Sequence, residues 1–251
     1  MVFQARPPRA AFQRPALQLT ALAVRAAAGL QVGKLGARYQ EWLSFPSLSA
    51  EPQKMFNGWL LEHASRTPWW TVPLVWLPLA AAVFHASLVR HATPPAAAAA
   101  HAVAGLLAWR LVEYALHRFV FHATPRGYWA ITLHFSFHGC HHKRPADRLR
   151  LVFPPLFAAP LVAAFARAIH AALPGQPGRA AAFAAGMLCG YVAYDCTHYF
   201  AHAPLASRTP WLARVRSAHL AHHFSDSTRS FGVSGDLLDR VFGTLPAWRR
   251  A

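Results

Sequence analysis

Cysteine and acidic residues are both scarce in this chain of 251 residues. Its cysteines are only three in number, Cys140, Cys189 and Cys196, so no disulfide framework and no oxidising compartment are indicated. Nine acidic residues stand against 25 lysines and arginines, which gives a formal net charge of +16. The sequence also lacks a nucleic-acid-binding motif. The basic surplus therefore points to anionic lipid headgroups or anionic protein partners.

The N-terminal segment contains no acidic residue at all, because the first one is Glu41. Residues 1–32 are rich in alanine and arginine, which partly matches a mitochondrial or chloroplast transit peptide; serine, the other usual component, is lacking. A basic tail without a targeting role is the alternative. No compact apolar core with a small-residue cleavage site occurs, which argues against a secretory signal. We interpret 1–32 as a basic extension and 33–251 as a membrane domain.

Long apolar stretches indicate an integral membrane protein. Hydrophobic residues make up 55% of the chain and charged residues 14%, with a mean hydropathy of +0.20. A helix that crosses the hydrocarbon core of a bilayer needs about 20 apolar residues. Tryptophans precede the first such stretch, as is typical of segments at the headgroup level. The candidate transmembrane stretches cover about residues 70–89, 96–116, 152–173 and 180–200.

The connections between these stretches predict two helical hairpins. The turns at 91–95 and 174–179 are too short to hold soluble domains, so both hairpins place their open ends on the same side. The basic loop 143–150 lies on that side, and positive charge marks the cytosolic face of a membrane. We therefore expect both termini to be cytosolic. Because the second and fourth stretches are rich in marginally apolar alanine, a shallow or re-entrant hairpin is the alternative.

Histidine is the residue in excess. The chain has sixteen histidines, and ten of them fall into four tight clusters beside the apolar stretches. Neutral imidazole is the commonest protein metal ligand, and ten such ligands are too many for one metal site and enough for two. The clusters are His117 and His122; His138, His141 and His142; His198 and His202; and His219, His222 and His223.

The spacing within the clusters indicates helical faces. Residues three or four apart on an α-helix project from one side of it. Within each of three clusters, the rings therefore share one face of a helix. His117 and His122 are five residues apart, which predicts a helix end or a π-type turn. Together the four faces predict a centre of two metal ions. The isolated histidines are interpreted as structural: His63, His85, His91, His101 and His170.

Groups beside the clusters are candidates for orienting the ligands. A metal-bound histidine usually donates its second ring N–H to a carboxylate or a carbonyl. His134 lies one helical turn before His138 and could be a ligand, an orienting group or a residue that faces the substrate, but we leave it out of the ligand set. The acidic candidates are Glu113, Asp195 and Asp239, together with Asp147, for which helix capping or a salt bridge is an equal alternative.

The donor set limits the choice of metal. Coordination by histidine alone suits zinc, iron, copper or nickel. Zinc has no redox chemistry, so iron is expected if the reaction uses dioxygen. Cys140 lies inside the second cluster, where it is either a soft ligand or, as we prefer, a small residue at a packed position.

At these motifs the chain resembles the fatty acid hydroxylase superfamily of membrane di-metal oxygenases. Within it, the chain is most similar to the plant and yeast fatty acid 2-hydroxylases, and especially to the plant form, which lacks a fused cytochrome b5 domain. The resemblance covers about residues 33–247. It is carried by GKLGARYQEW from Gly33, RTPWWTVPLVWLP from Arg66, EYALHRFVFH from Glu113, HGCHHKRPADRLRLVFPP from His138, GYVAYDCTHYFAH from Gly190, AHLAHHF from Ala218 and FGVSGDLLDRVFGTLP from Phe231.

The resemblance implies an all-α membrane protein with four transmembrane helices and a cytosolic helical cap that holds two metals on the ten clustered histidines. It implies iron for catalysis, with zinc as the alternative occupant, and O2 as co-substrate. Electrons would come from NAD(P)H through cytochrome b5 and its reductase. The implied reaction is 2-hydroxylation of a very-long-chain acyl group of ceramide or dihydroceramide, in sphingolipid biosynthesis at the endoplasmic reticulum membrane. A plastid or mitochondrial membrane is the alternative location if 1–32 is a transit peptide.

The chain departs from the family pattern at three positions, Ala203, Ala218 and Leu238, which leaves the substrate preference open. A sterol or sphingoid-base oxidase or desaturase of the same superfamily is therefore the alternative function. A histidine-rich metal transporter or buffer is a further alternative. It is less favoured because transporters usually place their ligands at the midplane of the membrane, whereas these histidines lie at helix ends and beyond.

Overall fold

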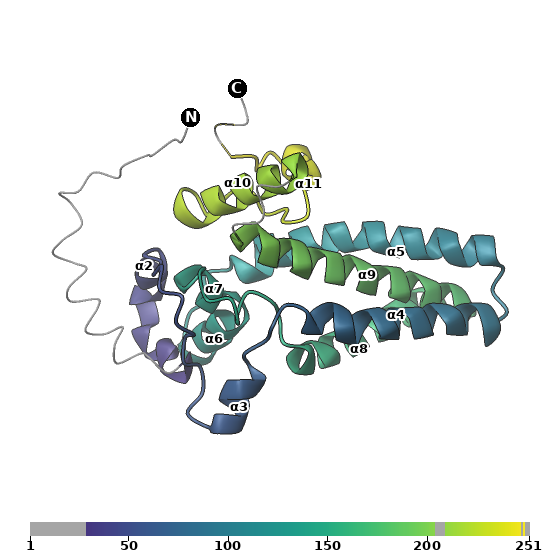
Figure 1. Cartoon of the computed structure of the whole chain (residues 1–251), viewed down its shortest axis with the longest axis horizontal. Coiled ribbons are helices and arrows are strands. Elements are labelled where there is room, and N and C mark those ends of the chain that lie inside the picture. The colour runs from purple at the N-terminus through teal and green to yellow at the C-terminus, as the bar shows by residue number, and fades with distance from the viewer. Residues whose placement is uncertain (1–28, 204–208, 247, 249–251) are drawn as a thin grey trace.

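The computed structural model describes residues 29–203, 209–246 and 248, and every regular element in these ranges is helical (Figure 1). The predicted all-α fold is thus confirmed for this part of the chain. Four long helices form a bundle: α4 (Thr71–Val89), α5 (Pro95–Ala115), α8 (Pro155–Ala172) and α9 (Pro177–His202).

Shorter elements form a cap at one end of the bundle (Figure 1). They are the 3-10 helix η1 (Gly29–Arg38), α2 (Tyr39–Leu43), α3 (Trp59–Ala64), the π-helix η2 (Leu116–Phe121), α6 (Tyr128–His134), the π-helix η3 (Phe135–Gly139), α7 (Cys140–Lys143), α10 (Pro210–Phe224) and α11 (Leu237–Val241). Residues 1–28 of the predicted basic extension lie outside the described residues. Val32, the last residue of that extension, is buried in the core of the cap.

The long helices match the predicted stretches and pair as hairpins. Three of them begin with a proline, which suits the first helical position because its φ angle is preset and its missing N–H is not needed there. This is why the third helix begins at Pro155, three residues after the predicted start. Both hairpin turns lie at the end of the bundle opposite the cap, where Ser87 Oγ donates a hydrogen bond to the carbonyl of Gly178 at 2.7 Å (Figure 1).

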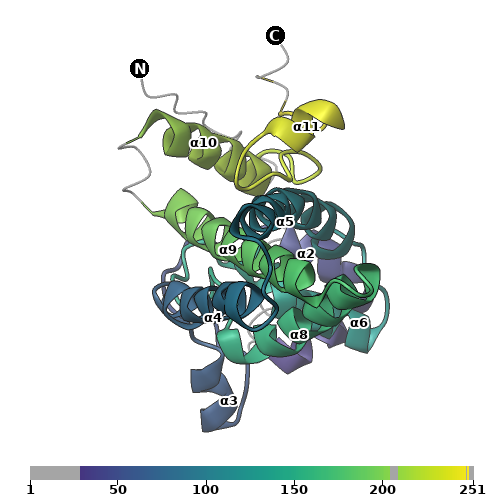
Figure 2. The same ribbon diagram turned by 90° about the vertical axis from the view of Figure 1, so that its right-hand side faces the viewer.

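Within the described part of the chain, three helices are long and apolar enough to cross a membrane: Thr71–Val89, Pro95–Phe121 and Pro155–Ala172. The remaining predicted span, α9, lies at the centre of the bundle against α4, α5 and α8 (Figure 2). Much of its surface therefore contacts protein instead of lipid. A helix in that position needs small side chains more than apolar ones, and this explains its alanine- and glycine-rich sequence.

The contact between α5 and α9 brings two backbones together. A Cβ atom on Gly186 would lie 1.9 Å from the carbonyl oxygen of Ala102, and one on Gly105 would lie 2.0 Å from that of Phe183. Gly190 follows Gly186 by one turn and faces the same helix. This is the small-residue spacing that lets membrane helices approach closely. The close contact thereby fixes the distance between α5, which leads to His117, and α9, which carries His198.

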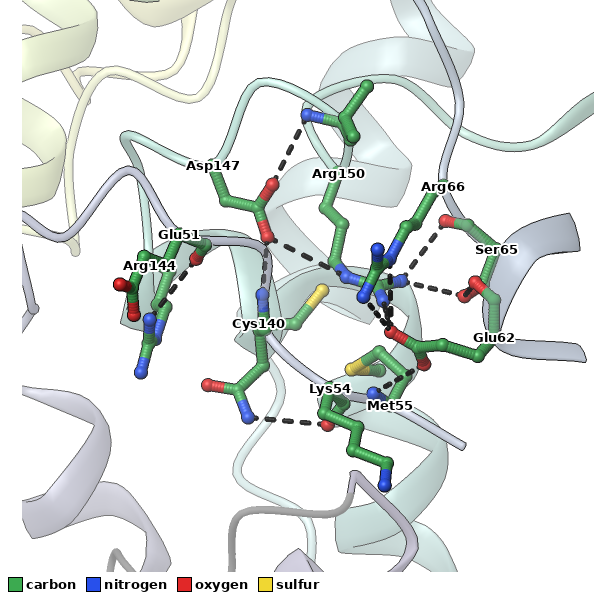
Figure 3. Close-up of polar contacts among 12 residues, drawn as sticks. Glu51, Lys54, Met55, Glu62, Ser65, Arg66, Cys140, Arg144, Asp147 and Arg150 are labelled. Carbon is green, nitrogen blue, oxygen red and sulfur yellow. Dashed lines mark hydrogen bonds and ion pairs between the residues drawn. The ribbon is translucent and has the colours of Figure 1, made fainter. Parts of the chain in front are cut away.

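An ionic network attaches the segment before α4 to the loop after α7 (Figure 3). The buried carboxylate of Glu62 binds Arg150 at 2.8 Å and Arg66 at 2.9 Å. Asp147 accepts the backbone N–H of Gln53 at 2.7 Å and lies 3.6 Å from Arg150. The sequence allows Asp147 to be either an orienting group for a histidine or a residue that caps a helix or forms a salt bridge. Its contacts in the described structure include the salt bridge. The network holds the chain immediately after the second histidine cluster.

Candidate metal centre

Two groups of five histidines meet where the bundle joins the cap. Within each group the ligand atoms all lie within 4.8 Å of one another. The first group consists of His117, His122, His138, His142 and His222. The second group consists of His141, His198, His202, His219 and His223. Every one of the ten clustered histidines belongs to one of these two groups, and none of the isolated histidines does.

Neighbours in the sequence are divided between the groups. His138 and His142, four residues apart, face the first group, while His141 between them faces the second. In α10 the pattern is reversed, because the pair four residues apart joins the second group and His222 joins the first. Consecutive residues on an α-helix point about 100° apart, so one helix wedged between two sites can serve both. Both α7 and α10 do so.

The expectation of a helix end or a π-type turn at His117 and His122 is confirmed, because the π-helix there ends just before His122. Residues 116–121 form the π-helix η2, and the N–H of His122 donates to the carbonyl of His117 at 3.1 Å. In a π-helix this bond joins residues five apart, so their side chains share a face. That geometry places both rings in the first group, with centroids 5.0 Å apart. The second π-helix, η3 (Phe135–Gly139), was not predicted, because the histidine spacing around it also fits an α-helix.

The ring nitrogens converge as ligands of a shared cation would. Two ligands that are each about 2.1 Å from one ion, and about 90° apart, lie about 3 Å from each other. The Nε2–Nε2 distances are 2.8 Å for His122 and His222, 2.8 Å for His202 and His219, 3.0 Å for His141 and His198, 3.1 Å for His219 and His223, and 3.3 Å for His122 and His138. The separations in both groups thus fit a bound metal ion.

Buried ring nitrogens without partners support the same fit. Among the described residues, Nε2 of His117 and Nε2 of His142 are buried and have no hydrogen-bond partner. A buried polar atom left unpaired costs about 1–3 kcal/mol. Both atoms belong to the first group, where coordination of a cation would supply the missing interaction.

Backbone carbonyls set the orientation of three of the rings. A carbonyl only accepts hydrogen bonds, so in each case Nδ1 carries the proton and Nε2 is left free to bind a metal. The pairs are His117 with Phe231 at 2.7 Å, His198 with Leu151 at 2.8 Å and His222 with Arg229 at 2.6 Å. These carbonyls are the orienting groups that the sequence did not identify, since any residue can supply one.

Two of the predicted acidic residues hold the loop that provides two of those carbonyls. Asp239 accepts the backbone N–H groups of Phe231 and Gly232 at 2.9 Å each. Glu113 accepts the N–H of Ser234 at 2.7 Å. Neither carboxylate binds a ring nitrogen of the ten histidines within the described structure. Their effect on the histidines passes through the loop backbone, because the carbonyls already occupy the positions next to Nδ1.

Asp195 likewise holds a backbone segment that leads to a carbonyl bound by a histidine ring. It accepts the N–H of Phe153 at 3.2 Å, two residues after the carbonyl that binds His198.

Ser230, between the two carbonyls of the C-terminal loop, has a φ of 60° and is buried. This left-handed conformation is uncommon for residues other than glycine. It occurs at the one residue that separates the carbonyls facing His222 and His117.

Comparison with known proteins assigns a family to this centre. Residues 102–244, which contain all ten clustered histidines, match the family model described as fatty acid hydroxylase. The chain belongs to the fatty acid hydroxylase family. This confirms the resemblance carried by the sequence motifs.

Relatives within the fatty acid hydroxylase family match most of the chain. The dihydroceramide fatty acyl 2-hydroxylase FAH2 of Arabidopsis thaliana is 42% identical over 221 residues, which cover 88% of this chain and 92% of that protein. The fatty acid 2-hydroxylase of Mus musculus is 38% identical over 234 residues, 86% of this chain and 62% of that protein. The solved structure described as full-length scs7p, with only its hydroxylase domain visible, has a TM-score of 0.75 at 34% identity and covers 82% of this chain and 77% of that chain.

His134 and Cys140 lie outside both histidine groups of this family member. The Nε2–H of His134 donates to the carbonyl of Phe121 at 2.7 Å, and its Nδ1 accepts from the hydroxyl of Tyr39 at 2.6 Å. Burial lowers the pKa of His134, which keeps the ring neutral. Cys140 packs in the core of the cap with Tyr39 and Phe135, as the packing interpretation expects.

Two cavities reach the histidine groups from outside. One, of about 210 Å³, is lined by His122, His142 and His223, and so touches both groups. The other, of about 220 Å³, is lined by His202 of the second group and by Ala203. Ala203 is one of the positions at which the chain departs from the family pattern. The departure therefore alters the wall of a cavity beside the histidines.

Burial keeps the imidazoles in the neutral form that binds metals. Burial, and secondarily the neighbouring His117 ring, lowers the pKa of His222 from 6.5 to about 3. Burial is also the largest cause that lowers the pKa values of His138 and His219. In the unfolded chain these groups take up protons near pH 6.5, whereas the folded chain resists protonation until much lower pH. The unfolded state then binds more protons over that window, so acid favours unfolding.

We expect the thermal midpoint of the metal-free protein in detergent to fall as the pH is lowered from about 6.5 towards about 4. Differential scanning fluorimetry after treatment with a chelator measures this. A His222→Gln variant removes one of the titrating groups, so its midpoint should depend less steeply on pH. A midpoint that stays constant or rises on acidification would contradict the neutral, buried state of these histidines.

Proposed function

We propose that the protein is an O2-dependent membrane oxygenase that hydroxylates C2 of the very-long-chain acyl group of ceramide or dihydroceramide. The observation that carries the proposal is the pair of five-histidine groups in a member of the fatty acid hydroxylase family. Relatives that match most of the chain are named for 2-hydroxylation of fatty acyl groups, which supports this carbon and this substrate. The reaction belongs to sphingolipid biosynthesis.

Each histidine group holds one metal ion in this proposal, iron in the working enzyme and zinc as an alternative occupant. Two bound iron ions would supply the activation of O2, which zinc cannot because it has no redox chemistry. One oxygen atom enters the C2–H bond, and the other leaves as water after two electrons and two protons are taken up. Cytochrome b5, reduced by its reductase with NAD(P)H, is the proposed source of those electrons.

The chain's own contribution is to present ten neutral ring nitrogens in a site where most of them are buried. The carbonyls of residues 151, 229 and 231 hold three rings with Nε2 directed inward. Ligands held in place before the metal binds lose little conformational freedom on binding. Positioning C2 of a lipid beside this site supplies a further large part of the catalysis.

The proposed orientation has four membrane spans, α9 being the fourth, and a cap on the cytosolic face of the endoplasmic reticulum. The distribution of positive charge supports it, because the cytosolic side of a membrane protein is enriched in lysine and arginine. The loop 143–150 at the cap carries four such residues, whereas the turns at the opposite end carry Arg90 and Arg179. A lipid amide at the cytosolic headgroup level would then place C2 close to the histidines, with the acyl tail along the helices.

We expect the iron-loaded protein, supplied with reduced cytochrome b5, ¹⁸O₂ and a very-long-chain ceramide, to release a 2-hydroxyacyl ceramide that carries one ¹⁸O atom. Mass spectrometry of the product and its fragments locates the oxygen. Protein stripped of metal is the control and should consume no O2. A double bond, or a hydroxyl group on the sphingoid base or on a sterol, would favour the alternative oxidase or desaturase. An absence of turnover with all components present would contradict an enzymatic role.

A further inference from the structure

A chain of two hydrogen bonds connects the N-terminal part of the cap to the turn that carries His122. The hydroxyl of Tyr39, at the start of α2, lies 2.6 Å from Nδ1 of His134 at the end of α6. Nε2 of His134 lies 2.7 Å from the carbonyl of Phe121, the last residue of the π-helix η2. His122 follows directly. Segments from three separate parts of the sequence thus meet at one ligand of the first histidine group.

The direction of these hydrogen bonds follows from the groups that make them. The carbonyl of Phe121 only accepts, so Nε2 of His134 carries the ring proton. A neutral imidazole has one donor and one acceptor nitrogen, so Nδ1 accepts from the hydroxyl of Tyr39. Both ring nitrogens of His134 are then fully used. This rules His134 out as a ligand in the described arrangement and leaves it as a connection between two backbone segments.

The connection is built into the packing of the cap. Tyr39 is only 1% exposed, and its ring meets that of His134 edge-on with centroids 5.5 Å apart. A Cβ atom on Gly139 would lie 2.2 Å from the Tyr39 hydroxyl, so the absence of a side chain there lets the hydroxyl reach His134. Tyr39 is therefore buried and packed against both His134 and Gly139, and its hydroxyl in turn holds the imidazole.

His122 is a ligand of the first group whose backbone lies at a helix end. It lies at the C-terminal end of η2, where the helix stops, and its backbone is no longer helical. His117 and His222 are each oriented by a backbone carbonyl, but no described hydrogen bond holds Nδ1 of His122 in that way. It is also the one half-buried member of the first group, whose other four histidines are buried. Its ring direction therefore depends on the backbone at residues 121 and 122.

We propose that His134 is a positioning residue: by binding the carbonyl of Phe121 and being held by Tyr39, it sets the direction of His122 and so the metal affinity of the first group. The inference rests on the proposed function only in requiring that the two groups bind metal. It concerns a histidine outside the ten, and it assigns the cap segment that begins at η1 a part in forming the metal centre.

The test compares the metal content of purified variants by inductively coupled plasma mass spectrometry, followed by competition with a graded series of chelators. His134→Leu removes both hydrogen bonds, and Tyr39→Phe removes one while keeping the ring. We expect His134→Leu to lower the affinity of one of the two sites by about 10–100-fold, the range found when a group that orients a metal ligand is lost. Tyr39→Phe should have a smaller effect in the same direction.

Rescue by a conservative substitution separates positioning from simple loss of packing. The side-chain amide of His134→Gln offers N–H donors and a carbonyl acceptor, so we expect it to restore most of the affinity. His101→Leu, which changes a half-buried histidine in α5 far from the centre, is the matched control and should keep both sites unchanged. Unchanged affinity in His134→Leu, or equal losses in His134→Leu and His134→Gln, would overturn the inference. Wild-type protein without bound metal would instead overturn the proposed function.

Discussion

The substitutions His222→Ala and His223→Ala are expected to empty two different metal sites, although the two residues are adjacent in the sequence. His222 belongs to the first group and His223 to the second. Loss of a ligand should weaken metal binding at least as much as loss of a group that orients one, which costs about 10–100-fold. Each variant should therefore retain about one ion per chain where the wild type holds about two, and lose hydroxylation because the proposed reaction uses both ions.

Double variants reveal which site each histidine serves. His117→Ala added to His222→Ala removes a second ligand from the site that is already empty, so the metal content should not change further. His198→Ala added to His222→Ala should remove the second ion as well. This contrast is the expected behaviour of residues that act as one unit compared with residues at separate sites. Metal analysis and the ceramide assay measure both effects.

The exposed His170→Ala is the control and should keep both ions and full turnover. Identical results from the two double variants would show that the division of the ten histidines into two groups is wrong. Full metal content and turnover in His222→Ala would show that this residue is not a ligand.

The substitution Gly186→Ala is expected to destabilise the whole bundle. The added Cβ would lie 1.9 Å from the carbonyl oxygen of Ala102, a backbone atom that cannot move aside without displacing α5. Overpacking of this kind typically costs about 1–3 kcal/mol, and the backbone clash places the cost at the upper end of that range. The π-helix with His117 follows α5, and α9 carries His198. A clash that pushes the two helices apart should therefore also lower metal occupancy.

Thermal unfolding in detergent and metal content of the same samples measure this effect. Gly58→Ala is the matched control, since a Cβ on Gly58 meets nothing within 4 Å and its φ of −74° suits alanine. We expect the control to unfold at the wild-type temperature. Equal midpoints for Gly186→Ala and Gly58→Ala would show that α5 and α9 do not depend on this close approach.

Local patterns in the sequence predicted most of the elements. Runs of apolar residues sufficed for the long helices, because this signal acts within the residues that form each helix, whereas the prolines that begin three of these helices in the structure played no part in predicting their starts. The five-residue spacing of His117 and His122 likewise predicted a helix end or a π-type turn, and a π-helix ends there. The central position of α9 was not predicted. It depends on glycines that approach α5, and although Gly186 and Gly190 have the four-residue spacing of such contacts, that spacing does not say which helix they meet.

By itself the sequence selected the ten histidines that the fold brings together, predicted that they suit two metal ions, and indicated the family to which the chain belongs, because residue type and short spacing are local properties. Only the tertiary structure decided how the ten divide. His141 and His142 differ by one position and so by about 100° around α7, and which site each one meets depends on the helices packed on either side. The orienting carbonyls of Leu151, Arg229 and Phe231 were likewise beyond the sequence, because every residue carries a carbonyl and only folding aims it.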